Sequence, residues 1–145
     1  MTTRDVGPIT VMSDDDCWAQ LSSRTLGRLA TSVDGCPDIF PVNYVVQRHT
    51  ILIRTAEGTK LAGVAINGRV AFEADDHDVV EGWSVVVKGQ ARVLSTSEEL
   101  ADADRAQVLP WTATPKQRFI RVMPVEITGR RFQFGAEPDH LYDFG

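Results

Sequence analysis

The stretch TILIRTAEGTKLAGVAING, residues 50–68, determines more of the fold than any other part of the chain. Its first six residues, 50–55, form an apolar and β-branched run, which predicts a strand. A short loop follows, and the apolar positions then recur at helical spacing, which predicts a helix over 59–66. Asn67-Gly68 is a natural stop for that helix. The sequence therefore predicts a strand–loop–helix unit at this place.

Polar side chains gather where this strand meets the helix: Arg54, Thr55, Thr59 and Lys60. The first N–H groups of a helix have no partner inside the helix, and the helix dipole adds partial positive charge there. Two cations, two hydroxyls and free amides at one point suit a phosphate group. The same residues also fit a polar turn before a surface helix, with the charges in solvent. The junction is thus a candidate phosphate site with an ordinary alternative.

Length and composition are those of one globular domain. The chain has 145 residues, 43% of them hydrophobic and 24% charged, and a formal net charge of -5. We expect a single domain over 1–145, with an extended lead-in at 1–12 and a tail at 135–145. The acidic balance argues against nucleic acid as a partner. No apolar run is long enough to cross a bilayer and no signal-peptide pattern is present, so we expect a cytoplasmic protein without a membrane partner.

The rest of the sequence predicts short strands joined by turns, with helices between some of them. Three helices are predicted, over 14–22, 59–66 and 97–108, the first capped by Ser13. At least six strands are predicted, over 27–33, 39–46, 50–55, 69–74, 83–94 and, as a hairpin-like pair around Thr128-Gly129, 119–134. Asp34-Gly35 is a hairpin turn signal. A bend or bulge is expected at Gly89 inside the long strand, and an acidic loop over 75–78.

Hairpin connections make antiparallel neighbours, and this many strands in one small domain favour a closed or partly open barrel. A doubly wound parallel sheet is not expected, because strands and helices do not alternate regularly and no Gly-x-Gly-x-x-Gly is present. The fold class predicted from the pattern is therefore mainly β, an antiparallel barrel with a few short helices.

A second candidate segment precedes the quoted stretch, at 40–44. Pro41 lacks a backbone donor and is awkward inside a central strand, but it is tolerated where one side of the strand faces a ligand or an edge. Asn43 and Tyr44 offer polar groups to a flat heterocycle. An edge strand with an ordinary turn residue explains the same pattern equally well.

Trp83 opens the long strand at 83–94 and is the third candidate. An indole at a strand start can stack on an aromatic ligand or form a wall beside it. A tryptophan at such a position is as often part of the core.

Neither a metal site nor a nucleophile can be assembled from the sequence. His77 lies among aspartates, but no second histidine stands at ligand spacing, so no metal is expected. Cys17 and Cys36 are too few and too far apart for a disulfide framework and are expected to be small buried or half-buried side chains. No Gly-x-Ser-x-Gly elbow is present and no catalytic side chain is assigned, so an enzyme of this sequence would take its reactive atom from a cofactor.

Several segments occur in an order that is typical of one protein family. They are Gly27-Arg28-Leu29-Ala30, Phe40-Pro41-Val42-Asn43-Tyr44, residues 54–61, Ala71-Phe72-Glu73 and residues 83–89. Together they make the chain similar to the pyridoxamine 5'-phosphate oxidase-like flavin-binding split barrels, nearest the branch with nitroimidazole-resistance-type proteins. The C-terminal arginine and histidine pattern of true pyridoxamine-phosphate oxidases is missing, so oxidation of vitamin B6 is not expected.

The resemblance implies an antiparallel split β-barrel that forms a homodimer, with two cofactor sites in the subunit interface. Family members bind FMN, and some relatives bind the deazaflavin coenzyme F420. By this similarity the cofactor phosphate would be held by Arg54, Thr55, Thr59 and Lys60. The ring would be lined by Pro41, Val42, Asn43 and Tyr44, with Trp83 and Ser84 near its edge. Arg130 and Arg131 would reach across the dimer only as a weaker assignment, outside the predicted site.

Two functions follow from this interpretation. The first is a flavin- or deazaflavin-dependent oxidoreductase that transfers hydride or electrons to a small, flat, electron-poor substrate. The alternative is a non-catalytic protein that binds, stores or senses a flavin or a haem, for which His77 and His49 are the obvious axial ligands. FMN is the cofactor expected first, and coenzyme F420 is its alternative.

Overall fold

The computed structural model describes residues 7–56, 58–109 and 118–135. Seven strands and three helices lie in this part of the chain. In order they are β1 (Ile9–Val11), α1 (Asp14–Ser22), β2 (Leu26–Val33), β3 (Cys36–Gln47), β4 (Thr50–Thr55), α2 (Thr59–Ile66), β5 (Arg69–His77), β6 (Glu81–Val93), α3 (Ser97–Asp104) and β7 (Arg118–Gln133).

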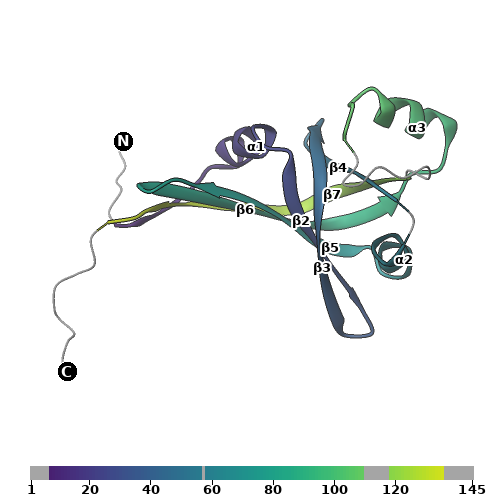
Figure 1. Cartoon of the computed structure of the whole chain (residues 1–145), viewed down its shortest axis with the longest axis horizontal. Coiled ribbons are helices and arrows are strands. Elements are labelled where there is room, and N and C mark those ends of the chain that lie inside the picture. The colour runs from purple at the N-terminus through teal and green to yellow at the C-terminus, as the bar shows by residue number, and fades with distance from the viewer. Residues whose placement is uncertain (1–6, 57, 110–117, 136–145) are drawn as a thin grey trace.

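All strand pairs in the described residues are antiparallel, in the order β1-β7-β4-β3-β2-β5-β6. A further pairing of β7 with β6 joins the two sides of the sheet. In Figure 1 the long strands β6 and β7 run along the molecule, the β2–β3 hairpin projects to one side, and α3 lies at the end opposite the β5–β6 turn. The predicted mainly β, antiparallel fold is confirmed, and the arrangement is consistent with a split barrel.

Strand β4 is buried on both faces. Ile51 and Ile53 lie in the main core, whereas Leu52 packs in a second cluster with residues of α3 and β7. A strand covered on both faces needs no polar alternation, so the uninterrupted apolar run of the sequence has a physical reason.

Local sequence signals set several boundaries as predicted. The hydroxyl of Ser13 accepts the N–H of Asp16 and caps α1. Asp34 and Gly35 both have positive φ, 51° and 77°, as a two-residue hairpin turn requires. A register shift falls at Gly89, where a side chain would collide with the Met123 carbonyl oxygen.

The acidic run at 75–77 is strand, and the prediction of a loop over 75–78 is wrong for these residues. Strand β5 stays paired with β6 as far as His77, opposite Gly82. Two arginines supply the opposite charge, because Arg24 pairs with Asp76 and Arg28 with Asp75. Charge compensation across the sheet lets aspartates remain in a strand that their own propensity disfavours.

The C-terminal segment is one strand, so the hairpin predicted around Thr128-Gly129 is also wrong. Gly129 lies in the middle of β7 beneath α1, and a Cβ there would stand 2.5 Å from the Cys17 sulfur. The glycine therefore serves close packing of a helix on the strand and makes no turn.

Three smaller expectations differ from the structure. Helix α3 ends at Asp104, short of Val108, before Gln107 takes a positive φ of 56°. Ala65 is exposed on α2, where Val64 and half-buried Leu61 form the packed side. Cys17 is buried as expected, but Cys36 is exposed beside the hairpin turn. Most of the loop predicted at 109–115 lies outside the described residues.

Candidate functional site

Arg54 ends β4 with a guanidinium group that is only partly satisfied. Its Nη1 donates to the Val108 carbonyl at 3.2 Å, and its central carbon lies 5.7 Å from the centre of the Phe119 ring. The Nε atom is buried and has no hydrogen-bond partner in the described part of the chain. A buried cationic donor without an acceptor is costly, and an anionic ligand would remove that cost.

The start of α2 is open to an anion. Gly58 at the N-cap provides no side-chain hydrogen bond, and the first turn carries no acidic residue. Thr59 begins the helix and is exposed, whereas Thr55 is buried and its hydroxyl donates to the Ala56 carbonyl at 3.2 Å. Thr55 and Thr59 are four residue steps apart along the chain, so their Cα atoms are at most about 14 Å apart. Lys60 belongs to this first turn, and its side chain lies outside the described structure.

The predicted ring-lining segment divides between two faces of β3. Val42 and Tyr44 are buried in the core, and the Tyr44 hydroxyl donates to the Leu21 carbonyl at 2.7 Å. Pro41 and Asn43 alternate with them and point to the opposite side, exposed and half-buried respectively. Only Pro41 and Asn43 therefore present side chains outward from this segment.

Arg54 points to the same side of the sheet as Asn43. Tyr44 pairs with Ile53 in the β3–β4 ladder, and both side chains face the main core. Asn43 and Arg54 are the next residues beyond that pair, so by strand alternation their side chains lie on the other side. Arg54 and the outward half of the 40–44 segment are therefore neighbours.

Trp83 and Ser84 also point to opposite faces of β6. Trp83 is 8% exposed in the core, where its remaining surface lines a polar pocket of about 360 Å³ together with Arg24 and Arg131. Ser84 is half-buried on the outward side, opposite Arg130 of β7. Of the two residues, only Ser84 shares a face with Pro41 and Asn43.

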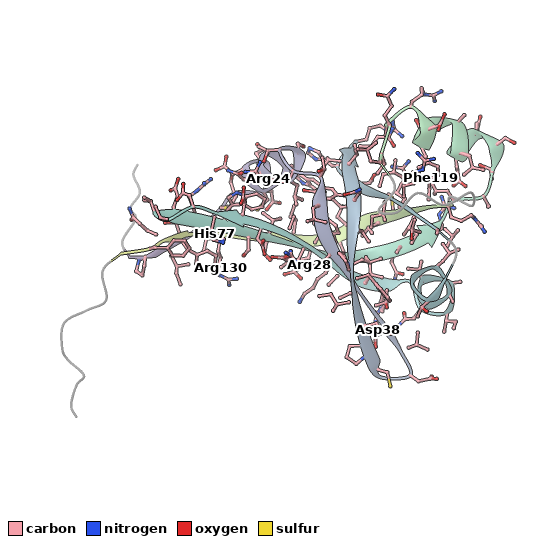
Figure 2. All side chains as sticks on the ribbon, viewed as in Figure 1. Arg24, Arg28, Asp38, His77, Phe119 and Arg130 are labelled. Carbon is pink, nitrogen blue, oxygen red and sulfur yellow. The ribbon has the colours of Figure 1, made fainter. Side chains whose placement is uncertain are left out.

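We call this shared surface the outer face and define it by Pro41 and Asn43 of β3, Arg28 of β2, Glu73 and Asp75 of β5, and Ser84 of β6. Register places Arg28 opposite both Pro41 and Glu73, and Asp75 opposite Ser84. From β3 to β6 the face spans three strand spacings, roughly 14 Å. Figure 2 shows Arg28 near the middle of the long axis, between Arg130 toward the termini and Phe119 toward α3.

Sequence reasoning assigned no role to Arg28, Glu73 and Asp75. Arg28 Nη1 lies 2.6 Å from a Glu73 oxygen and 3.5 Å from an Asp75 oxygen. Burial raises the pKa of Glu73 to about 7, assisted by a hydrogen bond and the negative charge of Asp75 and opposed by Arg28. The available signal was the alternation of Arg28 and Glu73 with the buried Leu29 and Phe72 in the resembling segments, which Ala74 and Asp75 continue just beyond them.

A groove of about 510 Å³ opens on the same side of the sheet. The groove is lined by Ala30, Ala71 and Lys88, among others. These three residues are paired across β2, β5 and β6, two positions along the strands from the Arg28–Glu73 pair. This volume is in the range of small-molecule sites. A groove with room for a ligand thus adjoins the outer face on the same side of the sheet.

The two histidines in the described residues stand apart from this surface. The ring of His49 stacks on Trp18 with centroids 4.7 Å apart, and His77 is exposed at the β5–β6 turn beside Phe134. No group of three or more histidine, cysteine or acidic side chains in the described ranges could hold a metal ion. The helices described here are all too short or too polar to span a bilayer.

Comparison with known proteins identifies the family. The family model described as pyridoxamine 5'-phosphate oxidase matches residues 13–131. The FAD binding protein from Mycobacterium smegmatis is 55% identical, over 87% of this chain and 100% of that chain, with a TM-score of 0.76. A proposed pyridoxamine 5'-phosphate oxidase from Corynebacterium glutamicum is 36% identical, over 92% and 100% of the two chains, with a TM-score of 0.81.

A proposed 5-nitroimidazole antibiotic resistance protein from Bacteroides thetaiotaomicron shares the fold at 16% identity. The match covers 86% of this chain and 88% of that chain, with a TM-score of 0.69. An antiparallel barrel of this kind is the fold of flavin-binding split barrels. The chain belongs to the pyridoxamine 5'-phosphate oxidase family, and the resemblance stated from its sequence is confirmed.

Proposed function

We propose that the protein binds a flavin nucleotide and is an oxidoreductase that passes hydride or electrons to a small, flat, electron-poor substrate. The observation that carries the proposal is the buried Nε of Arg54, which has no hydrogen-bond partner among the described residues, in the strand that precedes the uncapped start of α2. Such a pair suits an anionic phosphate group, which accepts several charge-assisted hydrogen bonds.

The residues present fit a flavin nucleotide. Arg54, Thr55, Thr59 and Lys60 would hold its phosphate, and Pro41, Asn43 and Ser84 would border its ring on the outer face. Val42, Tyr44 and Trp83, which are buried, would support these contacts from the core side. When bound, the flavin supplies the redox chemistry through its central ring. The protein's own residues bind and orient it and exclude water, and no side chain is assigned a catalytic role.

FMN and coenzyme F420 remain the cofactors proposed from the sequence, and FAD joins them. The similar protein from Mycobacterium smegmatis is described as FAD binding. All three molecules carry a phosphate, so the site at Arg54 does not discriminate among them.

We also propose a homodimer that covers the outer face and places the cofactor between subunits. Leu26 and Ile39 point to this side and are 44% and 65% exposed, next to the charged groups of the face. Exposed apolar side chains rimmed by charge are typical of protein–protein contacts. Sedimentation equilibrium tests this directly, and a monomer at micromolar concentration with flavin bound would contradict the dimer.

The phosphate assignment is tested with variants and with two forms of one ligand. Titrations of FAD, FMN and F420 establish which cofactor binds. Arg54→Ala and Lys60→Ala should each weaken binding of the phosphorylated flavin by about 1.5–3 kcal/mol, which is roughly 10- to 150-fold. Riboflavin has the same ring but no phosphate, and its weaker affinity should not change. Arg105→Ala, which changes an exposed arginine at the C-cap of α3, is the matched control.

Failure of all three cofactors to bind the folded protein would overturn the proposal. If Arg54→Ala lost equal affinity for riboflavin and for the flavin nucleotide, the role of Arg54 in binding phosphate would be overturned. Turnover is tested by reducing the bound cofactor and adding electron acceptors. No faster reoxidation with a broad panel of flat, electron-poor acceptors would favour the alternative, a protein that stores or senses flavin.

A further inference from the structure

Two carboxylates share a single arginine at the centre of the outer face. Arg28 approaches Glu73 and Asp75 through the same Nη1 atom, at 2.6 Å and 3.5 Å. The side chains of Arg28, Glu73 and Asp75 are 42%, 28% and 43% exposed. With all three ionised, this cluster carries one negative charge in excess, on a surface partly removed from water.

Among the described residues, the surroundings of Glu73 contain little further positive charge. On β2 it faces Arg28, and on its own strand Asp75 lies two residues away. On β6 it faces Val86, with Lys88 two residues further along, opposite Ala71. Arg130 of β7 lies opposite Ser84, which itself lies opposite Asp75. Arg130 is therefore in register with Asp75 and not with Glu73. One close cation for two carboxylates is the arrangement in which one acid retains its proton to higher pH.

The cluster occupies the middle of the surface on which the proposed function lays the redox ring. Arg28 stands between Pro41 and Glu73, and Asp75 is directly across from Ser84. Each of these pairs belongs to one hydrogen-bonded ladder, so the side chains point to the same side. A ring that touches both Pro41 and Ser84 crosses Arg28 and the two carboxylates.

We propose that Glu73 is a proton-binding residue of the redox site, which takes up a proton from solvent when negative charge is placed on the outer face. This inference rests on the proposed function. The proton adds to a carboxylate oxygen of Glu73, and no covalent bond of the bound ligand forms or breaks in this step. Added negative charge disfavours the ionised carboxylate, so charge on the ring and protonation of Glu73 favour each other.

Burial and Asp75 already raise the pKa of Glu73 to about 7, so the carboxyl is partly ionised near neutral pH and can respond in either direction. Reduction of a bound flavin would increase proton binding by Glu73, and oxidation would release that proton. Asp75 and Arg28 act through Glu73 by setting its proton affinity and are positioning residues.

The test measures the midpoint potential of the flavin-loaded protein as a function of pH, because the slope counts protons taken up per electron. Wild type should take up more protons per electron pair near neutral pH than Glu73→Gln. Asp75→Asn removes the negative charge that helps to raise the pKa of Glu73, so the pH range of uptake should move lower. Arg28→Gln removes the opposing cation and should move it higher. Glu98→Gln, an exposed glutamate on α3, should leave the curve unchanged.

Opposite shifts in Asp75→Asn and Arg28→Gln distinguish proton binding from a structural role, which would not move the two variants in opposite directions. The inference would be overturned, with flavin binding intact, if Glu73→Gln gave the same dependence of midpoint potential on pH as wild type. It would also be overturned if both positioning variants moved the pH range of proton uptake in the same direction. A protein that binds no flavin at any pH would overturn the proposed function and this inference together. Carboxyl NMR of the flavin-free protein then still reports whether Glu73 titrates near pH 7.

Discussion

Tyr44→Phe separates two roles of a residue that the sequence assigned to the cofactor. In the structure Tyr44 is 1% exposed, packs edge-on against Phe72 at 4.7 Å, and donates its hydroxyl to the Leu21 carbonyl at 2.7 Å. The variant removes one oxygen and keeps the ring. We expect a loss of stability and no change in flavin affinity.

The size of that loss follows from what the Leu21 carbonyl retains. It also accepts the backbone N–H of Arg24 at 3.3 Å, so removal of the tyrosine hydroxyl does not leave it without a donor. The full penalty of an unsatisfied buried group therefore does not apply, and we expect about 0.5–1.5 kcal/mol. For a chain of this size, that corresponds to a fall in Tm of roughly 2–5 °C.

Urea unfolding and a flavin titration of the same preparation measure the two quantities. Tyr44→Ala is the companion variant, in which loss of the ring should cost about 3–5 kcal/mol because a cavity remains. Burial also raises the pKa of Tyr44, so stability should fall as pH rises above about 10, and Tyr44→Phe should lack that contribution. Unchanged stability with a tenfold loss of flavin affinity would refute the assignment of Tyr44 to the core.

Three further perturbations test the packing and the ion pairs. Gly129→Ala places a methyl group 2.5 Å from the Cys17 sulfur and should lower the free energy of unfolding in urea by about 1–3 kcal/mol. Adding Cys17→Ala should restore part of this loss. If the two substitutions had additive effects on stability, the proposed clash would be contradicted. Leu52→Ala should cost about 2–5 kcal/mol, and a smaller loss would show that the cluster beneath α3 collapses around the change. Hydrogen bonds from Arg92 and from two backbone N–H groups lower the pKa of Glu99 to about 2. The stability that these hydrogen bonds contribute is present above about pH 4.5 and is lost on acidification. Between about pH 5 and 2, Glu99→Gln should therefore lose less free energy of unfolding than wild type. Parallel curves of stability against pH for the two proteins would refute the pairing.

Signals confined to a few neighbouring residues predicted the local structure well. The boundaries of α1, β4 and α2 match the predicted ranges because capping residues, a β-branched run and Asn67-Gly68 act within one or two turns of chain. The order of the resembling segments also identified the family.

Errors arose where a distant element decides the conformation. Thr128-Gly129 resembles a turn in isolation, but in β7 the glycine makes room for Cys17 of α1. The aspartates of β5 resemble a loop until Arg24 and Arg28 of other elements supply their counter-charges. Neither relation can be read from a window of sequence, because the partner residues are more than 40 positions away.

The candidate site shows the same division. The sequence by itself determined an antiparallel β protein of this family, and it led to the proposal of a phosphate site at 54–60, since helix ends and fixed cations act locally. Only the tertiary structure decided which neighbours share a face: Pro41, Asn43 and Ser84 point outward, whereas Val42, Tyr44 and Trp83 belong to the core. Strand register also brought Arg28, Glu73 and Asp75 together. Alternation assigns each side chain to one of the two faces of its own strand, but only the pairing of strands across the sheet determines which side chains lie next to each other.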